Sequence, residues 1–227
     1  MLFVSPLLHA GVISNFTTDN QGWTSVTFAN VSSQPDFGSV PASSAVTWNA
    51  AGGNPGGYIS KQDPDGNWQY FSAPAAFLGN QSSALGGSFL FDEILINNFG
   101  QPNLNPQGPL AALSNGTVTL VYGGNGGTAA ISGTNWNSFS LALNAASWKV
   151  STPNGAQATA AQISSVLSNL TGVYILSDFW TGSGASGEIL GIDNVNLTSA
   201  TPEPGSAALG LTGCLMLGIC LRRRSRT

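Results

Sequence analysis

The stretch from Gly87 to Ile96 reads GSFLFDEILI and is the strongest indication of the fold, because Phe, Leu and Ile dominate a run of strand length. A second run, Ser25–Val31 (SVTFANV), alternates polar and apolar residues at the period of two expected for a half-buried strand. Further strand-like runs are Thr117–Tyr122, Phe139–Leu143, Val173–Leu176 and Ile189–Leu197. Many short strands separated by Gly, Asn and Pro predict an all-β sandwich or jelly roll.

The connection after Tyr122 has the composition of a turn. Thr117–Tyr122 is followed by the glycine-rich Gly123–Gly127 and then by the strand-like Thr128–Ser132. Two β-runs flanking such a loop predict a hairpin.

A single helix is expected at Thr159–Leu170. Its apolar residues recur at i, i+3, i+4 and i+7 and form one face, namely Ile163, Val166, Leu167 and Leu170. Thr159 followed by Gln162 fits a capping box, and Gly172 stands where a left-handed C-terminal cap is expected. We therefore predict a short amphipathic helix packed at the edge of the sandwich.

Charge is scarce and unevenly placed. Charged residues make up 7% of the 227 residues, against roughly 25% in an average soluble chain. Four of the six cations lie in the last six positions, and residues 1–201 carry a net charge of −7. Nucleic acids and anionic membrane surfaces require Lys and Arg, so neither is an expected partner of this body.

The chemistry available to the body is also limited. Both cysteines, Cys214 and Cys220, lie near the C-terminus, and the single histidine, His9, lies near the N-terminus. A cysteine nucleophile, a histidine base, a disulfide framework and a His/Cys zinc site are therefore excluded between residues 11 and 198. Most enzyme classes are disfavoured by composition alone.

The first ten residues have the character of an export signal. Residues 1–10 read MLFVSPLLHA, an apolar run that ends in a small residue but lacks a basic beginning. Either the leader is short or its true start lies upstream. A buried first strand is the alternative, although Pro6 interrupts it. We divide the chain into this leader, a β-sandwich at 11–198 and a C-terminal segment at 199–227.

The C-terminal segment combines three parts in a fixed order. Pro202, Glu203 and Pro204 precede an apolar run at 205–221 and an arginine cluster at 222–226 that includes Arg222, Arg223 and Arg224. As a helix the apolar run would span about 25 Å, marginal for a bilayer core of about 30 Å. A buried soluble helix is the alternative.

This order resembles the PEP-CTERM sorting signal of Gram-negative bacteria. The resemblance implies transient anchoring in the inner membrane through the apolar helix, with the body outside. It also implies cleavage near Pro202–Pro204 by an exosortase-type enzyme as a partner, and a final place at the cell surface or outside the cell.

The body resembles the laminin B domain, also called laminin IV type A. The resemblance rests on Gly56–Ile59 (GGYI), Tyr70–Ser82 (YFSAPAAFLGNQS), Gly86–Asp92 (GGSFLFD) and Gly191–Val195 (GIDNV), and spans roughly residues 23–197. Leu85 stands where the family usually has tyrosine, and the cysteine-rich modules that flank the animal domains are missing from this sequence. The resemblance implies a galactose-binding-like jelly roll that is extracellular and non-enzymatic.

Two places offer oxygen ligands for a structural Ca²⁺. Asp63 and Asp65 lie in the loop Asp63–Asn67 (DPDGN), for which a plain β-turn is the alternative. In jelly-roll carbohydrate-binding modules a calcium ion often joins the first strand to the last, and Asp19 and Asp193 stand at corresponding places. The alternative for Asp193 is a carboxylate hydrogen-bonded to backbone in a strand bulge.

Aromatic residues crowd a region that is rich in Gly and Asn. Trp48, Tyr58, Trp68 and Tyr70 are candidate stacking surfaces for sugar rings, with Asn49, Asn54, Asp63 and Asn67 as polar partners. The alternative is that these rings are core residues of the sandwich.

No catalytic residues are assigned. The adjacent acids Asp92 and Glu93 point to opposite faces of a strand and cannot flank one bond, whereas Asp178 and Glu188 could meet in space. We therefore expect an exported structural or adhesion module that binds extracellular polysaccharide or surface proteins, with an acid-only glycan hydrolase or lyase as the alternative.

Overall fold

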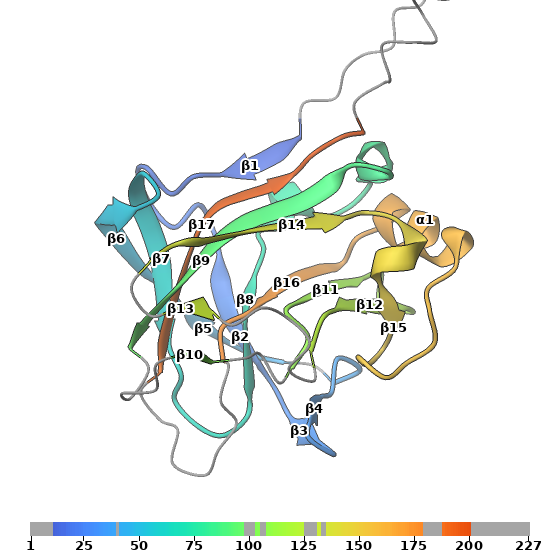
Figure 1. Ribbon diagram of the computed structural model, residues 1–227, viewed down its shortest axis with the longest axis horizontal. Helices are drawn as coiled ribbons and strands as arrows, with labels where there is room; N and C mark the ends of the chain where they lie inside the picture. Colours follow the sequence, from blue (N-terminus) through green and yellow to red (C-terminus); the bar gives the residue numbers. More distant parts are fainter. Residues whose placement is uncertain are drawn as a thin grey trace, which may run out of the picture.

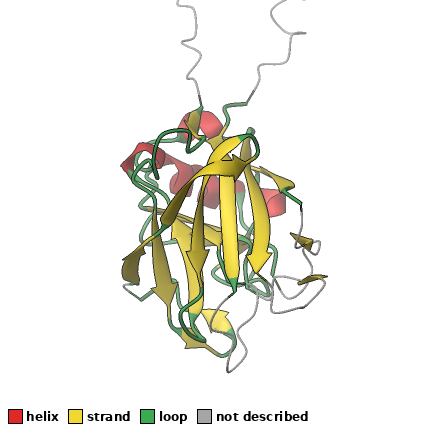
Figure 2. Cartoon of the chain, turned by 90° about the vertical axis from the view of Figure 1, so that its left-hand side faces the viewer, coloured by secondary structure: helices red, strands yellow, loops and turns green. Residues whose placement is uncertain are grey.

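Two antiparallel β-sheets lie face to face in the computed structural model, which describes residues 11–39, 41–97, 103–104, 108–124, 131–132, 135–178 and 188–200 (Figures 1 and 2). In order across the six-stranded sheet the strands are β14 (Asn137–Ala142), β9 (Ser88–Asn97), β17 (Ile189–Leu197), β7 (Gly56–Gln62) and β6 (Thr47–Gly53), with β1 (Val12–Ser14) also paired to β17. Strands from both ends of the described chain therefore lie side by side (Figure 1).

The seven-stranded sheet forms the other layer. In order across this sheet the strands are β15 (Lys149–Val150), β12 (Thr119–Tyr122), β11 (Ala111–Ser114), β16 (Gly172–Leu176), β8 (Trp68–Ser72), β2 (Thr24–Phe28) and β5 (Ala42–Ala45). The predominance of strands confirms the all-β prediction, and the two layers agree with a sandwich.

The predicted hairpin after Tyr122 is wrong. The strand β13 (Ile131–Ser132) pairs with β10 (Asn103–Leu104), whereas β12 pairs with β11 and β15. The reason is the tight turn at Asn115, whose side-chain oxygen accepts hydrogen bonds from the N–H groups of Thr117 and Val118 at 3.1 and 2.8 Å. This turn brings β11 against β12, a pairing partner that the sequence pattern did not reveal.

The other predicted strands are confirmed with small shifts of their ends. The run at 25–31 becomes β2 and, after a break at Ala29, β3 (Asn30–Val31), which forms a small hairpin with β4 (Gln34–Pro35). The decisive run at 87–96 forms β9, which lies between β14 and β17. Alternate side chains of β9 point into the interior between the two sheets, and Phe89, Phe91 and Leu95 are at most 1% exposed.

The predicted helix is present as α1 (Ala160–Ser168), with Thr159 as its N-terminal cap. The capping box is confirmed, because Thr159 Oγ1 accepts from the Gln162 N–H at 3.2 Å and Gln162 Oε1 accepts from the Thr159 N–H at 2.9 Å. The predicted cap at Gly172 is wrong, because Gly172 begins β16. Leu170 exchanges backbone hydrogen bonds with Gly79 instead, which turns the chain into extended structure.

Three short 3-10 turns accompany α1 at one end of the sandwich: η1 (Ala75–Phe77), η2 (Ser82–Ala84) and η3 (Ala145–Ser147) (Figure 2). Buried aromatic side chains anchor this end. The Trp148 indole N–H donates to the Ala142 carbonyl at 2.9 Å, and the Trp23 indole N–H donates to Ser14 Oγ at 3.0 Å. Both tryptophans are fully buried, so these bonds satisfy donors that water cannot reach.

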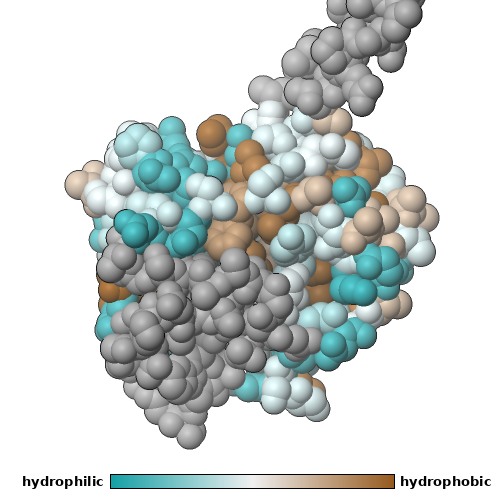
Figure 3. Space-filling model, viewed as in Figure 1, coloured by the Kyte–Doolittle hydropathy of each residue, from teal (hydrophilic) through white to brown (hydrophobic). Residues whose placement is uncertain are grey.

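The surface is mixed. Hydrophobic atoms emerge between hydrophilic ones on the face shown in Figure 3. Exposed large apolar side chains include Ile13, Val31, Trp48, Leu85 and Ile96.

The leader at 1–10 and the sorting motif with its apolar run and arginine cluster, at 202–226, lie outside the described residues. Among the described helices, none combines the length and the hydropathy that a bilayer crossing needs.

Candidate functional site

The outward face of the six-stranded sheet carries an aromatic pair. Tyr58 of β7 and Trp136, which precedes β14, have ring centroids 5.5 Å apart and an interplanar angle of 80°. The Trp136 indole N–H donates to the Gly52 carbonyl at 3.1 Å, which ties the ring to the hairpin of β6 and β7. Both rings are half-buried, so each keeps apolar surface in contact with solvent.

A glycine creates the room for Tyr58. Gly191 of β17 lies under the Tyr58 ring, and a Cβ atom at this position would come within 2.9 Å of the ring. The same Cβ would lie 3.1 Å from Ile94 of β9. The absence of a side chain at Gly191 therefore lets the Tyr58 ring lie over the neighbouring strand.

An amide–carboxylate cluster occupies the same sheet and consists of Asp92, Asp193, Asn54 and Asn194. The two carboxylate residues are direct neighbours across β9 and β17. Asp193 accepts from the backbone N–H of Asn54 at 2.6 Å and from its neighbour Asn194 at 2.7 Å. Asp92 accepts from the side-chain amides of Asn54 and Asn194 at 3.1 and 2.8 Å.

A β-bulge aims Asn194 into this cluster. The register of β17 on β9 shifts between Asp193 and Asn196, and Asn194 adopts a φ of 50°. The extra residue turns the Asn194 amide toward the β6–β7 hairpin, where it also donates to the Asn54 carbonyl. The cluster thus fastens a hairpin tip to the two central strands.

The cluster combines negative charge with burial. Burial raises the pKa of Asp193 above its ordinary value, and the neighbouring charge of Asp92 adds to the increase. Hydrogen bonds from Asn54 and Asn194 oppose it. Beside the aromatic pair, the cluster offers carboxylate and amide groups of the kind that orient the hydroxyls of a polyol.

Two of the four predicted aromatic residues are partly exposed, and the other two are buried in the core. Tyr58 belongs to the aromatic pair. Trp48 is 38% exposed on the edge strand β6, and its indole N–H donates to the Phe16 carbonyl at 2.8 Å. Trp68 and Tyr70 are fully buried, which corrects the expectation that their rings face a ligand and agrees with the core alternative. They are buried because a loop covers this face of β8: a Cβ at Gly108 would clash with the Trp68 ring, and Tyr70 donates to the Pro109 carbonyl at 3.0 Å.

The predicted calcium ligands Asp19 and Asp193 have different surroundings. Asp19 is exposed and accepts from the Gln21 N–H at 2.8 Å within its own turn, whereas Asp193 is held by the amides described above. Within the described ranges, no group of three or more Asp, Glu, His or Cys side chains is arranged to hold a metal ion. Calcium at Asp19 and Asp193 stays a prediction.

The Asp63–Asn67 loop has the hydrogen bonds of two successive Asx turns. Asp63 accepts from the Asp65 N–H at 3.1 Å, and Asp65 accepts from the Asn67 N–H at 2.8 Å. Asp63 is nevertheless fully buried, and its Oδ2 atom has no hydrogen-bond partner. Burial raises the pKa of Asp63 to about 6; the Asp65 N–H acts against this rise and the Asp65 charge adds to it. A calcium ion at Asp63 and Asp65 likewise stays a prediction.

The adjacent acids Asp92 and Glu93 do point to opposite faces, as predicted. Glu93 faces the interior, is 0% exposed, and neither of its carboxylate oxygens has a hydrogen-bond partner. Burial raises the pKa of Glu93 well above its ordinary value, and the nearby charge of Glu188 adds to the increase. Glu93 therefore lies close enough to Glu188 for their charges to interact, a proximity that the sequence did not indicate.

Sequence reasoning missed Trp136, Asn194 and the role of Asp92 in the site. The segment Asn135–Asn137 (NWN) places an aromatic residue between two amides, and this pattern could have marked Trp136. Asp193 followed by Asn194 inside a strand is a signal for a bulge. The proximity of Asp92 to both depends on strand pairing and had no local signal.

Comparison with solved structures finds the same fold in the L4b domain of human laminin α-2. The match has 11% sequence identity, covers 85% of this chain and 99% of that chain, and has a TM-score of 0.57. The family 11 carbohydrate-binding module of the cellulosomal cellulase Lic26A-Cel5E of Clostridium thermocellum is similar more distantly. That match has 13% identity, covers 86% of this chain and 98% of that chain, and has a TM-score of 0.48.

No curated protein sequence matches the chain. A sequence model of one family does match, over residues 70–210 and so over more than half of the chain. The match includes part of β8 and all of β9, β16 and β17, the strands that form the centre of both sheets. The chain belongs to the Laminin B (Domain IV) family.

Proposed function

We propose that this chain is an exported surface module that binds extracellular polysaccharide on the outward face of its six-stranded sheet. The observation that carries the proposal is the position of the aromatic pair, Tyr58 and Trp136, on the same face as the amide–carboxylate cluster. Sugar rings present apolar C–H faces and polar hydroxyl edges, so their recognition needs both kinds of surface together.

The negative charge of the amide–carboxylate cluster favours neutral ligands over anionic ones. Asp92 and Asp193 are the charged groups of the cluster, and the hydrogen bonds described for them come from amides. The carboxylates would repel an anionic ligand brought to this face. Neutral polysaccharides are therefore the proposed ligands, ahead of uronic acid polymers.

Tryptophan substitution tests the proposal with a matched control. In titrations of the full chain with soluble neutral polysaccharides (β-glucan, xylan and galactan), Trp136→Ala should weaken binding of the preferred polymer at least tenfold, or about 1.4 kcal/mol. Trp48→Ala removes another partly exposed indole that also donates to a backbone carbonyl, and it should leave the affinity unchanged. Equal losses in both variants would refute the assignment of the face.

A purely structural or adhesive role is the second candidate, and one observation favours it. Asp193 is fully buried, and its contacts fasten the β6–β7 hairpin to β17, which is a stabilising role in its own right. If the full chain binds none of the polysaccharides, the structural role replaces the binding role.

The non-enzymatic assignment is tested in the same samples. The oligosaccharide products of an acid-only hydrolase or lyase would appear on prolonged incubation with the bound polymer. We expect the polymer to remain intact by mass spectrometry, and chain cleavage that is lost in Asp92→Asn would establish the enzyme instead.

The export part of the proposal rests on the C-terminal segment. The order Pro202–Pro204, apolar run and arginine cluster supports sorting by an exosortase-type enzyme, with residues 11–198 delivered to the cell surface or the exterior. In cells that express the full chain, the mature protein should end near residue 204 by intact-mass measurement. Replacement of Pro202, Glu203 and Pro204 by alanine should leave the full-length form, and an unprocessed wild-type protein would contradict sorting.

A further inference from the structure

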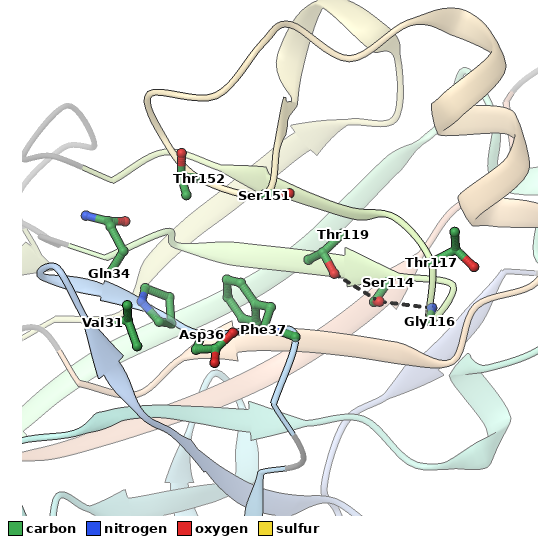
Figure 4. A pocket seen from close by; sticks show the side chains of 12 residues that line it. Val31, Gln34, Asp36, Phe37, Ser114, Gly116, Thr117, Thr119, Ser151 and Thr152 are labelled. Atoms are coloured by element: carbon green, nitrogen blue, oxygen red, sulfur yellow. Dashed lines mark hydrogen bonds between the residues drawn. The ribbon is translucent and has the colours of Figure 1, made fainter.

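A cavity of about 530 Å³ lies under the small β3–β4 hairpin (Figure 4). Its walls come from that hairpin, from the turn between β11 and β12, and from the segment at Ser151 and Thr152. The hairpin belongs to the side of the seven-stranded sheet (Figure 1), whereas Tyr58 and Asp193 lie on the six-stranded sheet. The cavity is therefore separate from the site described above.

Phe37 provides a rigid apolar wall. Its ring contacts Phe28 and Tyr70 edge to face, with centroid distances of 4.9 and 5.3 Å, and it stacks on Tyr174 at 6.1 Å. These contacts hold the ring in place while it remains only partly buried and lines the cavity (Figure 4). An aromatic side chain fixed in this way can receive the C–H face of a small ring without ordering cost.

Ser114 provides a directed donor. Its Oγ accepts from the Gly116 N–H at 3.1 Å and from the Thr119 hydroxyl at 3.1 Å (Figure 4). A hydroxyl group has two acceptor positions and one donor hydrogen, so the remaining capacity of Ser114 is donation. The Thr117 and Thr152 hydroxyls line the same cavity.

Asp36 provides a directed acceptor. One oxygen, Oδ1, accepts from the Gly38 N–H at 3.0 Å and fixes the carboxylate in a turn. The side chain is partly exposed and lines the cavity, so its second oxygen is accessible to a ligand. Asp36 is the single charged side chain among the described residues of the lining. The cavity thus disfavours anions and suits a neutral group that is rich in hydroxyls.

We infer that this cavity binds a neutral hexopyranose unit, with its ring against Phe37 and its hydroxyls shared between Asp36 and the hydroxyl groups of the β11–β12 turn. The volume falls within the range of 300–1,000 Å³ typical of small-molecule sites. This site does not depend on the proposed function, because it uses other residues on the other sheet.

Titration with simple hexosides tests the inference. The probes are methyl β-D-glucopyranoside, methyl β-D-galactopyranoside and methyl α-D-mannopyranoside, with glucuronic acid as the anionic comparison. At least one neutral hexoside should bind the full chain with a Kd on the order of 1 mM. The amide NMR signals of Gly38, Gly116 and Thr117 should shift on binding, whereas glucuronic acid should produce no shift.

Two variants separate this site from the polysaccharide face. Thr117→Trp places a bulky ring at an exposed position of the cavity wall and should abolish hexoside binding. Asp36→Asn keeps the acceptor for the Gly38 N–H but loses the charge, and should weaken binding at least tenfold. Trp48→Ala, which removes a partly exposed indole that belongs to neither site, is the matched control and should bind the hexoside as the wild type does. No binding of any neutral hexoside, or binding that survives Thr117→Trp in a folded protein, would overturn the inference.

Discussion

The buried loop carboxylate Asp63 should make the protein less stable as the pH rises from 4 to 7. Its pKa is raised from 3.8 to about 6, because the side chain is fully buried. The folded state therefore keeps the Asp63 proton to a higher pH than the unfolded chain does. The stability that this proton contributes is complete below about pH 4 and is lost as the pH passes through about 6.

The size of the effect follows from the shift. One pKa unit corresponds to 1.36 kcal/mol, so a shift of about two units changes the free energy of unfolding by about 3 kcal/mol. Domains of this kind have total stabilities of about 5–15 kcal/mol, so the change is measurable. The pKa values of Glu93 and Asp193 are also raised, and they add to a fall of stability with pH in the same direction.

The substitution Asp63→Asn isolates the part due to Asp63. The amide keeps the acceptor for the Asp65 N–H but has no charge to lose. Urea unfolding of the full chain in EDTA, followed by tryptophan fluorescence at pH 4, 5, 6 and 7, gives the free energy of unfolding at each pH. Between pH 4 and 7 the wild type should lose about 2.5 kcal/mol more than the variant, because a small part of the full effect is already lost at pH 4.

The exposed turn residue Asp19 provides the control. Asp19→Asn removes a carboxylate that accepts a hydrogen bond only within its own turn, and it should keep the wild-type dependence on pH. If Asp63→Asn loses stability with pH as steeply as the wild type does, within about 0.5 kcal/mol, the burial argument for Asp63 is refuted.

Three further outcomes are expected. Calcium chloride added to EDTA-treated protein should raise the unfolding temperature by ligand linkage if the Asp63–Asn67 loop binds the ion, and Asp65→Asn should lose this increase; an unchanged wild-type melt would contradict the calcium prediction. Thr159→Ala should cost about 1 kcal/mol in urea unfolding, because it removes the helix cap, and Thr159→Ser should restore most of the loss. Gly191→Ala should displace the Tyr58 ring and weaken polysaccharide binding while the far-ultraviolet circular dichroism spectrum is unchanged, and undiminished affinity would argue against a role for that ring.

The local sequence pattern was sufficient to predict most of the strands and the helix. The run that became β9 and the alternation that became β17 could be found because their side chains already show which positions are apolar. The helix cap was equally local, since Thr159 and Gln162 satisfy each other within one turn. The hairpin after Tyr122 failed because turn residues indicate where the chain bends and not which strand it meets.

The site was less accessible to sequence reasoning. Tyr58 was identified because it lies in a region crowded with aromatic residues, Gly and Asn, but Trp68 and Tyr70 lie in the same region and are core residues. The difference is the loop at Gly108 and Pro109, which covers the two buried rings from a distance of about forty positions along the chain.

The sequence alone was enough to predict an all-β body with few charges, no cysteine or histidine chemistry between residues 11 and 198, and one capped helix. These properties follow from composition and from periodicity along a single segment. The folded arrangement was needed to learn which side chains meet: Asp92 with Asp193 across two strands, Tyr58 with Trp136, and Asp36 with Ser114 around one cavity. The physical reason is that strand pairing and register join residues that are far apart in the chain, and the free energy that selects them is the burial of the whole core.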